Sequence, residues 1–312
     1  MTDDSRTIWK NGRLVPFAEA TTHVMSHALH YGSSVFEGIR CYRTERGPRF
    51  LRLEDHVDRL LASARIYRMP VLFGRDQLID ACHEVVVDNR LESAYVRPLL
   101  YRGHGRLGLD PGDTPTEAIV AAVEWDHYHG EGAKTDGVDA CVVSWQRPAP
   151  NTLPQLAKAG GNYLSGQLIA AEAHRDGYAE GIALGTDGYV SEGSGMNVFV
   201  ARGGVLFTPP ASCSLLPGLT RDLVFELARG AGFEVREERI VRELLLLADE
   251  LFLVGTAAEI TPVRSVDRAP VGDGRPGPMT RRLQRAFAEL VAGRIPDPRG
   301  HVTPLRRAEV HQ

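Results

Sequence analysis

The chain has 312 residues, of which 43% are hydrophobic and 24% are charged, and its formal net charge is -4. This length and balance predict a soluble protein of two domains. The mild negative charge gives no reason to expect nucleic acid or an anionic membrane as a partner. No apolar run approaches the ~20 residues of a membrane helix, and the start has no apolar signal core, so we expect a cytoplasmic protein. The four cysteines have no paired spacing and are expected to be reduced thiols.

Residues 1–125 are predicted to form a small N-terminal domain of short strands and helices, followed by a polar, glycine-bearing linker over residues 126–136. Apolar residues at helical spacing predict the first helix, and an Asn-Gly pair predicts a hairpin turn. In chain order we expect a hairpin over 7–15 turning at Asn11-Gly12, helices over 53–67 and 76–89, and strands over 93–100 and 117–124.

Residues 137–312 are predicted to form a larger domain. It is expected to contain a strand over 139–145, a helix over 163–174 capped by Asn162, hairpins turning at Asp187-Gly188 and Gly203-Gly204, a helix over 222–230 capped by Thr220, strands within 233–240 and 249–256, and a helix over 280–291. The tail from Ile295 is expected to be loosely held.

Lys158 lies in the stretch QLAKAGGNYLSG (155–166), among alanines and glycines. Only Lys10, Lys134 and Lys158 are lysines among the 36 Lys and Arg residues. Arginine stays protonated, whereas a lysine amine can serve as a nucleophile once its surroundings favour the neutral form. Small neighbours would leave room for a bulky aldehyde. The alternative is a solvated loop lysine, and composition alone does not exclude it.

Other residues supply what pyridoxal phosphate (PLP) requires besides a lysine: an acid for the ring nitrogen, a phosphate cradle and a donor to the ring hydroxyl. Glu192 precedes a glycine-rich turn, and LPGLTRD (216–222) is a tight turn into a helix. The alternative for Glu192 is an acid on a surface hairpin, and the alternative for LPGLTRD is an ordinary capped helix. The remaining candidates are the turn 255–258, Arg59 on the first helix and Tyr163 as the hydroxyl donor.

Seven motifs together resemble the branched-chain amino acid aminotransferases, a family of PLP fold-type IV. The resemblance extends from about Ile8 to Phe287 and is specific because the motifs occur together. They are MSHALHYGSSVFEGIRCY (25–42), SAYVRPL (93–99), RPAPNTLPQLAKAGGNYLS (147–165), YVSEGSG (189–195), LFTPP (206–210), LPGLTRD (216–222) and GTAAEITPVRSVD (255–267).

The resemblance implies a two-domain α/β (α+β type) fold, with a smaller N-terminal domain and a larger C-terminal pseudo-barrel, and a site in the cleft between the domains. It implies that Lys158 forms the Schiff base with PLP, that Glu192 faces the ring nitrogen and that Tyr163 donates to the ring oxygen. The phosphate-binding positions are Arg59, Leu219, Thr220 and Thr256. The walls of the substrate pocket are Tyr31, Phe36, Gly38, Trp125 and Tyr128, the α-carboxylate site is Tyr95, Thr256 and Ala257, and Arg97 receives the distal carboxylate of glutamate.

The activity implied is transfer of the amino group of Leu, Ile or Val to 2-oxoglutarate in two half-reactions, with Lys158 as general base. The family also implies a homodimer or a larger homo-oligomer. The same fold leaves three alternatives open: a transaminase for D-amino acids or (R)-amines, an aminodeoxychorismate lyase-like PLP lyase, and a non-catalytic binding protein.

Some positions depart from the family or carry signals that we set aside. Met196 stands where the family usually has Glu, and His301 where it often has Trp. The loop 103–113 does not indicate which substrate side chain the enzyme prefers. Its start satisfies GxGxxG, but the LDPGD that follows cannot open a helix, so we reject a dinucleotide site. His23, His27 and His30 have helical spacing without an evident fourth ligand, so we predict no metal.

Overall fold

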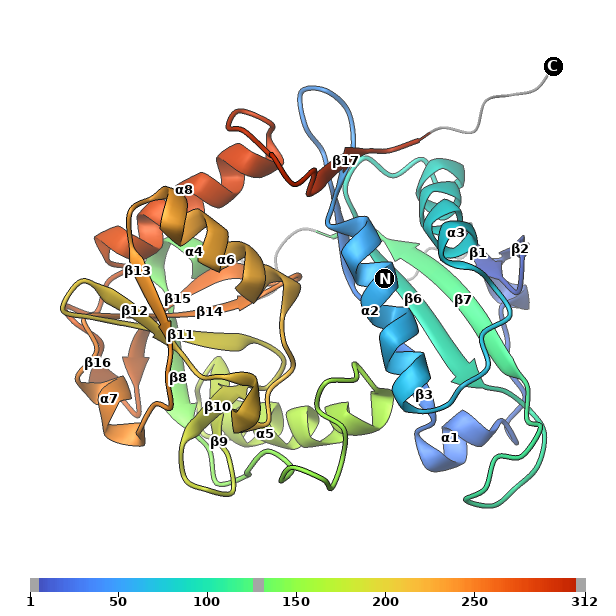
Figure 1. Ribbon diagram of the computed structural model, residues 1–312, viewed down its shortest axis with the longest axis horizontal. Helices are drawn as coiled ribbons and strands as arrows, with labels where there is room; N and C mark the ends of the chain where they lie inside the picture. Colours follow the sequence, from blue (N-terminus) through green and yellow to red (C-terminus); the bar gives the residue numbers. More distant parts are fainter. Residues whose placement is uncertain (1–5, 126–131, 307–312) are drawn as a thin grey trace. The chain divides into compact units, whose positions relative to one another are not determined.

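The computed structural model describes residues 6–125 and 132–306 (Figure 1). These residues form two compact units. Unit 1 contains residues 6–125, 157–161 and 290–306, and unit 2 contains residues 132–156 and 162–289. Each unit combines one sheet with helices, which confirms the predicted α/β class. No helix in the described ranges is long and apolar enough to cross a membrane.

Unit 1 is built on a sheet of eight strands, counted over the described residues, in the order β17-β5-β4-β6-β7-β1-β2, with β3 paired to β6. Helices α2 and α3 pack against each other and against this sheet (Figure 1). Phe50, Leu53 and Leu60 are fully or almost fully buried between these layers. The elements are β1 (Thr7–Lys10), β2 (Arg13–Pro16), α1 (His27–Tyr31), β3 (Ser34–Phe36), β4 (Ile39–Tyr42), β5 (Arg49–Leu51), α2 (Leu53–Ile66), α3 (Arg75–Asp88), β6 (Ala94–Arg102), β7 (Thr116–Val123) and β17 (Val302–Pro304).

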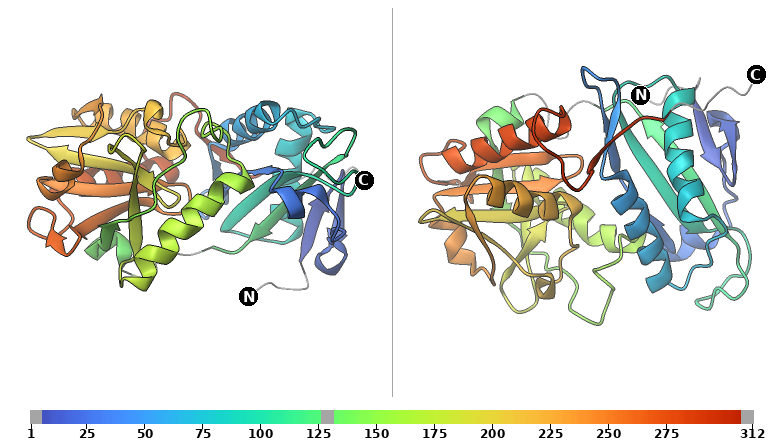
Figure 2. Two further views of the ribbon diagram at one scale, coloured as in Figure 1. Left: turned by 90° about the horizontal axis from the view of Figure 1, so that it is seen from below. Right: turned by 45° about the horizontal axis from the view of Figure 1, so that its top comes forward.

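Unit 2 is built on a mixed sheet of nine strands, again among the described residues, in the order β10-β9-β8-β15-β14-β11-β12-β13, with β16 paired to β15. Helix α5 packs on β9 and α6 on β13 and β14 (Figures 1 and 2). The elements are α4 (Ala133–Asp136), β8 (Val138–Val142), α5 (Tyr163–Arg175), β9 (Glu180–Leu184), β10 (Val190–Gly193), β11 (Asn197–Arg202), β12 (Val205–Thr208), α6 (Leu219–Gly230), β13 (Glu234–Glu237), α7 (Arg242–Leu246), β14 (Glu250–Gly255), β15 (Glu259–Val266), β16 (Ala269–Pro270) and most of α8 (Pro278–Val291).

The predicted hairpins and long helices are present. Asn11 and Gly12 have φ values of 48° and 96°, and Gly203 and Gly204 have 58° and 81°. Positive φ at both turn residues matches the twist of the flanking strands, which is why these pairs mark the turns in the sequence. The predicted helices correspond to α2, α3, α5, α6 and α8 with small shifts of their ends.

The two predicted caps differ in outcome. Asn162 occupies the N-cap position of α5 as predicted, but its side chain makes no capping hydrogen bond to the helix; its Nδ2 donates to the Pro154 carbonyl at 3.0 Å. Helix α6 begins at Leu219 after Gly218, so Thr220 lies inside the first turn. The prediction is therefore right in position for Asn162 and wrong for Thr220, because Gly218 is the N-cap residue of α6.

Two segments expected to be irregular are partly ordered. Within the predicted linker, α4 forms and Lys134 Nζ lies 2.5 Å from Glu259 Oε2. In the tail, β17 pairs with β5, and the carboxylate of Asp297 accepts the backbone N–H groups of His301 at 2.9 Å and Val302 at 2.8 Å. The prediction of a loosely held tail is therefore wrong for this strand.

We expect Asp297→Ala to lower the free energy of unfolding by about 1–3 kcal/mol, because two backbone N–H groups beside β17 lose their acceptor. Urea denaturation measures this difference. Asp297→Asn keeps one carbonyl acceptor and should lose less. Equal stability of Asp297→Ala and wild type would show that β17 does not depend on this carboxylate.

Candidate active site

Lys158 is held by its backbone in unit 1. Its N–H donates to Ser63 Oγ at 3.0 Å, and its carbonyl accepts the N–H of Phe36 at 3.0 Å. The next residue, Ala159, forms a β-bridge with Val35. The Nζ atom lies 5.0 Å from the centroid of the Phe36 ring. The sequence placed Lys158 in the second domain, but these contacts explain why its loop groups with unit 1.

The small residues beside Lys158 are explained by packing. Ala157 and Ala159 are buried in the hydrophobic core of unit 1. A Cβ on Gly160 would lie 2.4 Å from Ser34 Oγ, and a Cβ on Gly32 would lie 3.4 Å from the Cα of Gly161. The loop therefore needs small residues to dock against β3 and the residues before it. That these residues also leave room for a bulky aldehyde, the reason inferred from the sequence, stays a prediction.

Helix α2 presents His56, Arg59 and Ser63 on one face, because residues three and four apart are neighbours on a helix. Arg59 donates to the buried carboxylate of Glu37 through Nε at 2.6 Å and Nη2 at 2.9 Å. His56 Nδ1 lies 2.6 Å from the same carboxylate. Ser63 connects this face to the lysine, since its hydroxyl donates to the Arg59 carbonyl and accepts the Lys158 N–H.

The charges of this cluster are fixed by burial and by one another. Burial acts to raise the pKa of Glu37, but the charges of Arg59 and His56 and their hydrogen bonds hold it well below its ordinary value. Burial lowers the pKa of His56; Glu37 opposes this shift, and the positive charges of Arg59 and Lys158 add to it. At neutral pH the cluster therefore contains an ionised Glu37 beside the Arg59 guanidinium.

Three predicted site residues of unit 1, Phe36, Tyr95 and Trp125, form an aromatic group that contacts Arg97 through Phe36 and Tyr95. Arg97 lies over the Phe36 ring, with Cζ 4.7 Å from its centroid, and its Nη2 donates to Tyr95 Oη at 3.3 Å. Tyr95 stacks on Trp125 with ring centroids 4.8 Å apart. A Cβ at position 38 would lie 1.8 Å from Tyr95 Oη, so Gly38 is required for the tyrosine to adopt this position.

Tyr31 ends α1 and ties this helix to the loop 103–113. Its hydroxyl accepts the Gly108 N–H at 3.1 Å, while His27 Nε2 lies 2.9 Å from the Gly108 carbonyl. His23 contacts the ring of His104, and His30 lies within hydrogen-bond distance of the Val24 carbonyl. Within the described ranges no three His, Cys, Asp or Glu side chains are arranged to hold a metal ion. Tyr128 lies outside the described residues.

In unit 2, Glu192 is buried and held from three sides. A register shift between Val190 and Glu192 marks a β-bulge against β9, and such bulges re-aim side chains. Glu192 Oε1 lies 2.6 Å from Arg147 Nη2. Its Oε2 accepts the Nδ2 of Asn197 and the N–H of Leu216, both at 3.2 Å. The negative charge therefore has a buried counter-charge and two neutral donors.

The remaining unit 2 candidates lie near residues that follow Glu192 in the chain. A Cβ on Gly218 would lie 2.1 Å from Asn197 Oδ1, so the start of α6, before Leu219 and Thr220, is close to a residue that donates to Glu192. A Cβ on Gly255, the residue before Thr256 and Ala257, would lie 3.3 Å from Met196 Cγ. Tyr163 lies 3.9 Å from the Cβ position of Gly195. Met196, the departure from the family, packs in the core of unit 2.

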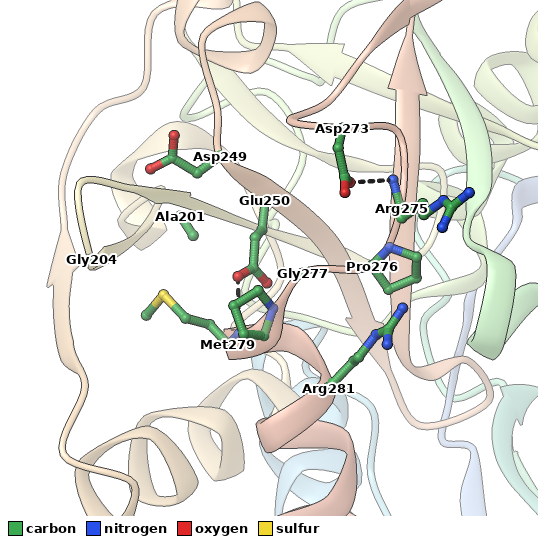
Figure 3. A pocket seen from close by; sticks show the side chains of 11 residues that line it. Ala201, Gly204, Asp249, Glu250, Asp273, Arg275, Pro276, Gly277, Met279 and Arg281 are labelled. Atoms are coloured by element: carbon green, nitrogen blue, oxygen red, sulfur yellow. Dashed lines mark hydrogen bonds between the residues drawn. The ribbon is translucent and has the colours of Figure 1, made fainter.

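A different pocket of unit 2, with a volume of about 710 Å³, contains none of the predicted site residues. Figure 3 shows Glu250 pointing from β14 toward the start of α8. Its carboxylate accepts the N–H groups of Met279 at 2.9 Å and Thr280 at 2.8 Å. This acid caps a helix, so we assign the pocket no catalytic role.

The site contains residues that the sequence did not single out. Glu37, His56 and Ser63 surround Arg59 and Lys158, and Arg147 and Asn197 surround Glu192. The helical spacing of His56, Arg59 and Ser63 was visible in the sequence. The other contacts join residues far apart in the chain and carry no local signal.

Residues 34–266 match the family described as amino-transferase class IV. The branched-chain-amino-acid aminotransferase of Salmonella typhimurium is 54% identical over 96% of this chain and 97% of its own length. A crystal structure of the Escherichia coli branched-chain amino acid aminotransferase has a TM-score of 0.95 at 52% identity and covers 97% of this chain and 100% of that one. A branched-chain aminotransferase from the archaeon Thermoproteus uzoniensis, solved with norvaline, has a TM-score of 0.92 at 39% identity, with coverage of 97% and 100%.

The chain therefore belongs to the class IV aminotransferases and, within them, to the branched-chain-amino-acid aminotransferase family. This confirms the resemblance seen in the sequence. The fold predicted with it, fold type IV, is confirmed by the likeness to the solved structures. The protein is a transaminase.

We expect Glu37→Gln to lower the free energy of unfolding at neutral pH by about 3 kcal/mol or more, because breaking a buried ion pair leaves the Arg59 charge uncompensated. Glu54→Gln is the matched control and should change stability little, because Glu54 lies on α2, the helix of Arg59, but in an exposed ion pair with Arg75. Urea denaturation of both variants measures the difference.

The effect of Glu37→Gln should depend on pH in a defined direction. The folded-state pKa of Glu37 is below its ordinary value of 4.5, so its contribution to stability is present above that value and is lost as the pH falls below it. The gap between wild type and variant should therefore shrink as the pH falls below that value. A gap that widens below it contradicts this assignment of the Glu37 charge.

Proposed function

We propose that the enzyme uses PLP to transfer the amino group of L-leucine, L-isoleucine or L-valine to 2-oxoglutarate, giving branched 2-oxo acids and L-glutamate. The anchored Lys158 carries this proposal, because a lysine held by its backbone on both sides can present its amine in one position. The names of the relatives support the substrate class, since they are called branched-chain-amino-acid aminotransferases at 54% identity.

The residues present fit this cofactor. A helix N-terminus favours an anion such as a phosphate, and α6 begins with Gly218 at a contact too close for a side chain. Glu192 is an acid whose buried charge is already compensated. When bound, PLP supplies an aldehyde that condenses with amines and a ring that withdraws electrons from the substrate carbon. A solved branched-chain amino acid aminotransferase, 43% identical to this chain, is complexed with N-(5'-phosphopyridoxyl)-L-glutamate, which supports the same choice.

Each candidate residue has a role that follows from its chemistry. Lys158 would hold PLP through its amine, and the same amine would act as the general base at the substrate α-carbon. Glu192 accepts a hydrogen bond from the ring nitrogen, and Tyr163 donates one to the ring oxygen. The phosphate is bound by Arg59, Leu219, Thr220 and Thr256. Glu37 fixes the position of Arg59 by accepting its two hydrogen bonds, and His56 contacts the same carboxylate.

One substrate pocket must accept both an aliphatic side chain and a carboxylate. We assign the apolar walls to the aromatic residues of unit 1 and the distal carboxylate to Arg97, which lies at an exposed edge of that group. The α-carboxylate is assigned to Tyr95, Thr256 and Ala257. Tyr31, Phe36, Gly38, Trp125 and Tyr128 complete the proposed wall.

We also propose a homodimer or a larger homo-oligomer. Large apolar side chains are exposed on unit 1 around α1 and in the loop 103–113, including Leu29 at 62% and Leu109 at 87%. Apolar side chains gathered on a surface mark sites of association. Hydrogen bonds tie this loop to α1, so the exposed group belongs to one structural element.

Reduction with borohydride in the presence of PLP should label Lys158 and leave Lys10 and Lys134 unlabelled, which peptide mass spectrometry reads directly. Lys158→Ala should lose the label and lower the transamination rate by about a thousandfold or more, since it removes the amine that both binds and moves the proton. Lys10→Ala is the matched control and should keep both. A label on Lys10 or Lys134 in place of Lys158 contradicts the proposed function.

Arg97→Ala should raise the KM for 2-oxoglutarate by about tenfold or more, because a hydrogen-bonded ion pair contributes about 1.5–3 kcal/mol. The half-reaction with L-leucine lacks a distal carboxylate and should change by less than about threefold. Steady-state and single-turnover kinetics separate the two. Equal losses of activity with 2-oxoglutarate and L-leucine would show that Arg97 supports the aromatic group and does not bind the distal carboxylate.

The same assays separate the alternative activities. Wild type should act on L-leucine and not on D-alanine or (R)-1-phenylethylamine. Release of pyruvate from aminodeoxychorismate without a 2-oxo acid acceptor would indicate a lyase. Failure of the purified protein to bind added PLP would indicate a binding protein on the same fold.

A further inference from the structure

Arg147 is a buried arginine of unit 2 with no role in the reaction assigned above. It lies in the segment between β8 and α5, and its backbone N–H donates to the Leu184 carbonyl of β9 at 2.9 Å. Its Nη2 lies 2.6 Å from Glu192 Oε1 and donates to Gln155 Oε1 at 3.0 Å. The side chains of Arg147 and Glu192 are only 7% and 6% exposed. The arginine is therefore fixed at the backbone and at the guanidinium.

The contact bears on the charge state of Glu192. An isolated carboxylate is costly to bury, whereas one paired with a guanidinium and hydrogen-bonded elsewhere is tolerated. Asn197 and Leu216 supply neutral donors to the other oxygen of Glu192. Arg147 supplies a buried positive charge in direct contact with this carboxylate. Loss of that counter-charge would favour uptake of a proton by Glu192, because burial penalises the charged form.

We propose that Arg147 is a positioning residue that keeps Glu192 ionised and fixed, and so gives the enzyme its preference for a cofactor with a protonatable ring nitrogen. The proposal rests on the proposed function, in which Glu192 faces that nitrogen. An ionised carboxylate is a strong acceptor for a pyridinium N–H, whereas a protonated acid is a poor one. Arg147 thus acts on the cofactor only through Glu192.

The test compares the affinity of the apoenzyme for PLP and for its 1-deaza analogue, in which carbon replaces the ring nitrogen. Absorbance titration gives the dissociation constant of each compound. The dissociation constant of the deaza analogue divided by that of PLP measures how strongly the enzyme recognises the ring nitrogen. We expect Arg147→Met to reduce this ratio by about tenfold, which corresponds to about 1.4 kcal/mol. Arg147→Lys keeps the charge and should retain most of the ratio.

A double-mutant cycle shows whether Arg147 acts through Glu192. Adding Arg147→Met to Glu192→Gln should leave the ratio unchanged, because the carboxylate on which the arginine acts is already absent. The double variant removes both charges of a buried pair, which destabilises a protein less than removing one of them. It can therefore still be measured if Arg147→Met alone does not fold. Circular dichroism checks the fold of each variant.

The outcomes are distinct. Equal weakening of PLP and the deaza analogue by Arg147→Met, or a further loss of the ratio in the double variant, would overturn the proposal and leave Arg147 a structural role. If the wild-type enzyme binds PLP and the deaza analogue equally, Glu192 does not recognise the ring nitrogen, and the proposal for Arg147 is overturned. A wild-type enzyme that binds neither would overturn the proposed function itself.

Discussion

The two backbone hydrogen bonds of Lys158 are the constraint on which the candidate site depends. They fasten a loop that comes between β8 and α5 in the chain to β3 and α2 of unit 1. The loop can approach only because Ala157, Ala159 and Gly160 are small. A larger residue at these positions would meet the core or Ser34 before the lysine reached its position. The backbone position of the proposed catalytic lysine is therefore decided by packing that has no chemical role of its own.

Buried charge pairs are the second recurring feature of the site. Glu37 pairs with Arg59 in unit 1, and Glu192 pairs with Arg147 in unit 2. Such pairs contribute little net stability, because the desolvation of both charges offsets their attraction. Their value lies in holding a guanidinium or a carboxylate in one orientation. Each pair joins a proposed ligand of the cofactor to a residue that fixes it, so charge and position are set together.

Close approach of backbone to side chain explains the glycines of the site. The missing Cβ of Gly38 leaves space for the hydroxyl of Tyr95. The missing Cβ atoms of Gly218 and Gly255 leave space for the side chains of Asn197 and Met196. In each case a Cβ would come within 3.3 Å or less of the neighbouring side chain. Two of these contacts bring the start of α6 and the end of β14 close to residues that follow Glu192 in the chain. The phosphate and carboxylate positions of the proposed site therefore depend on residues that have no side chain.

The sequence by itself determined the local elements and the family. Apolar residues at helical spacing and Asn-Gly or Gly-Gly pairs fix helices and hairpins through contacts within a few residues. Seven motifs together identified the aminotransferases and singled out Lys158. Tertiary structure alone decided the caps, the ordering of the tail by Asp297, and the unit to which Lys158 belongs. It alone paired Arg147 with Glu192. These features arise from contacts between distant parts of the chain, whose energies depend on burial and approach that no local pattern encodes.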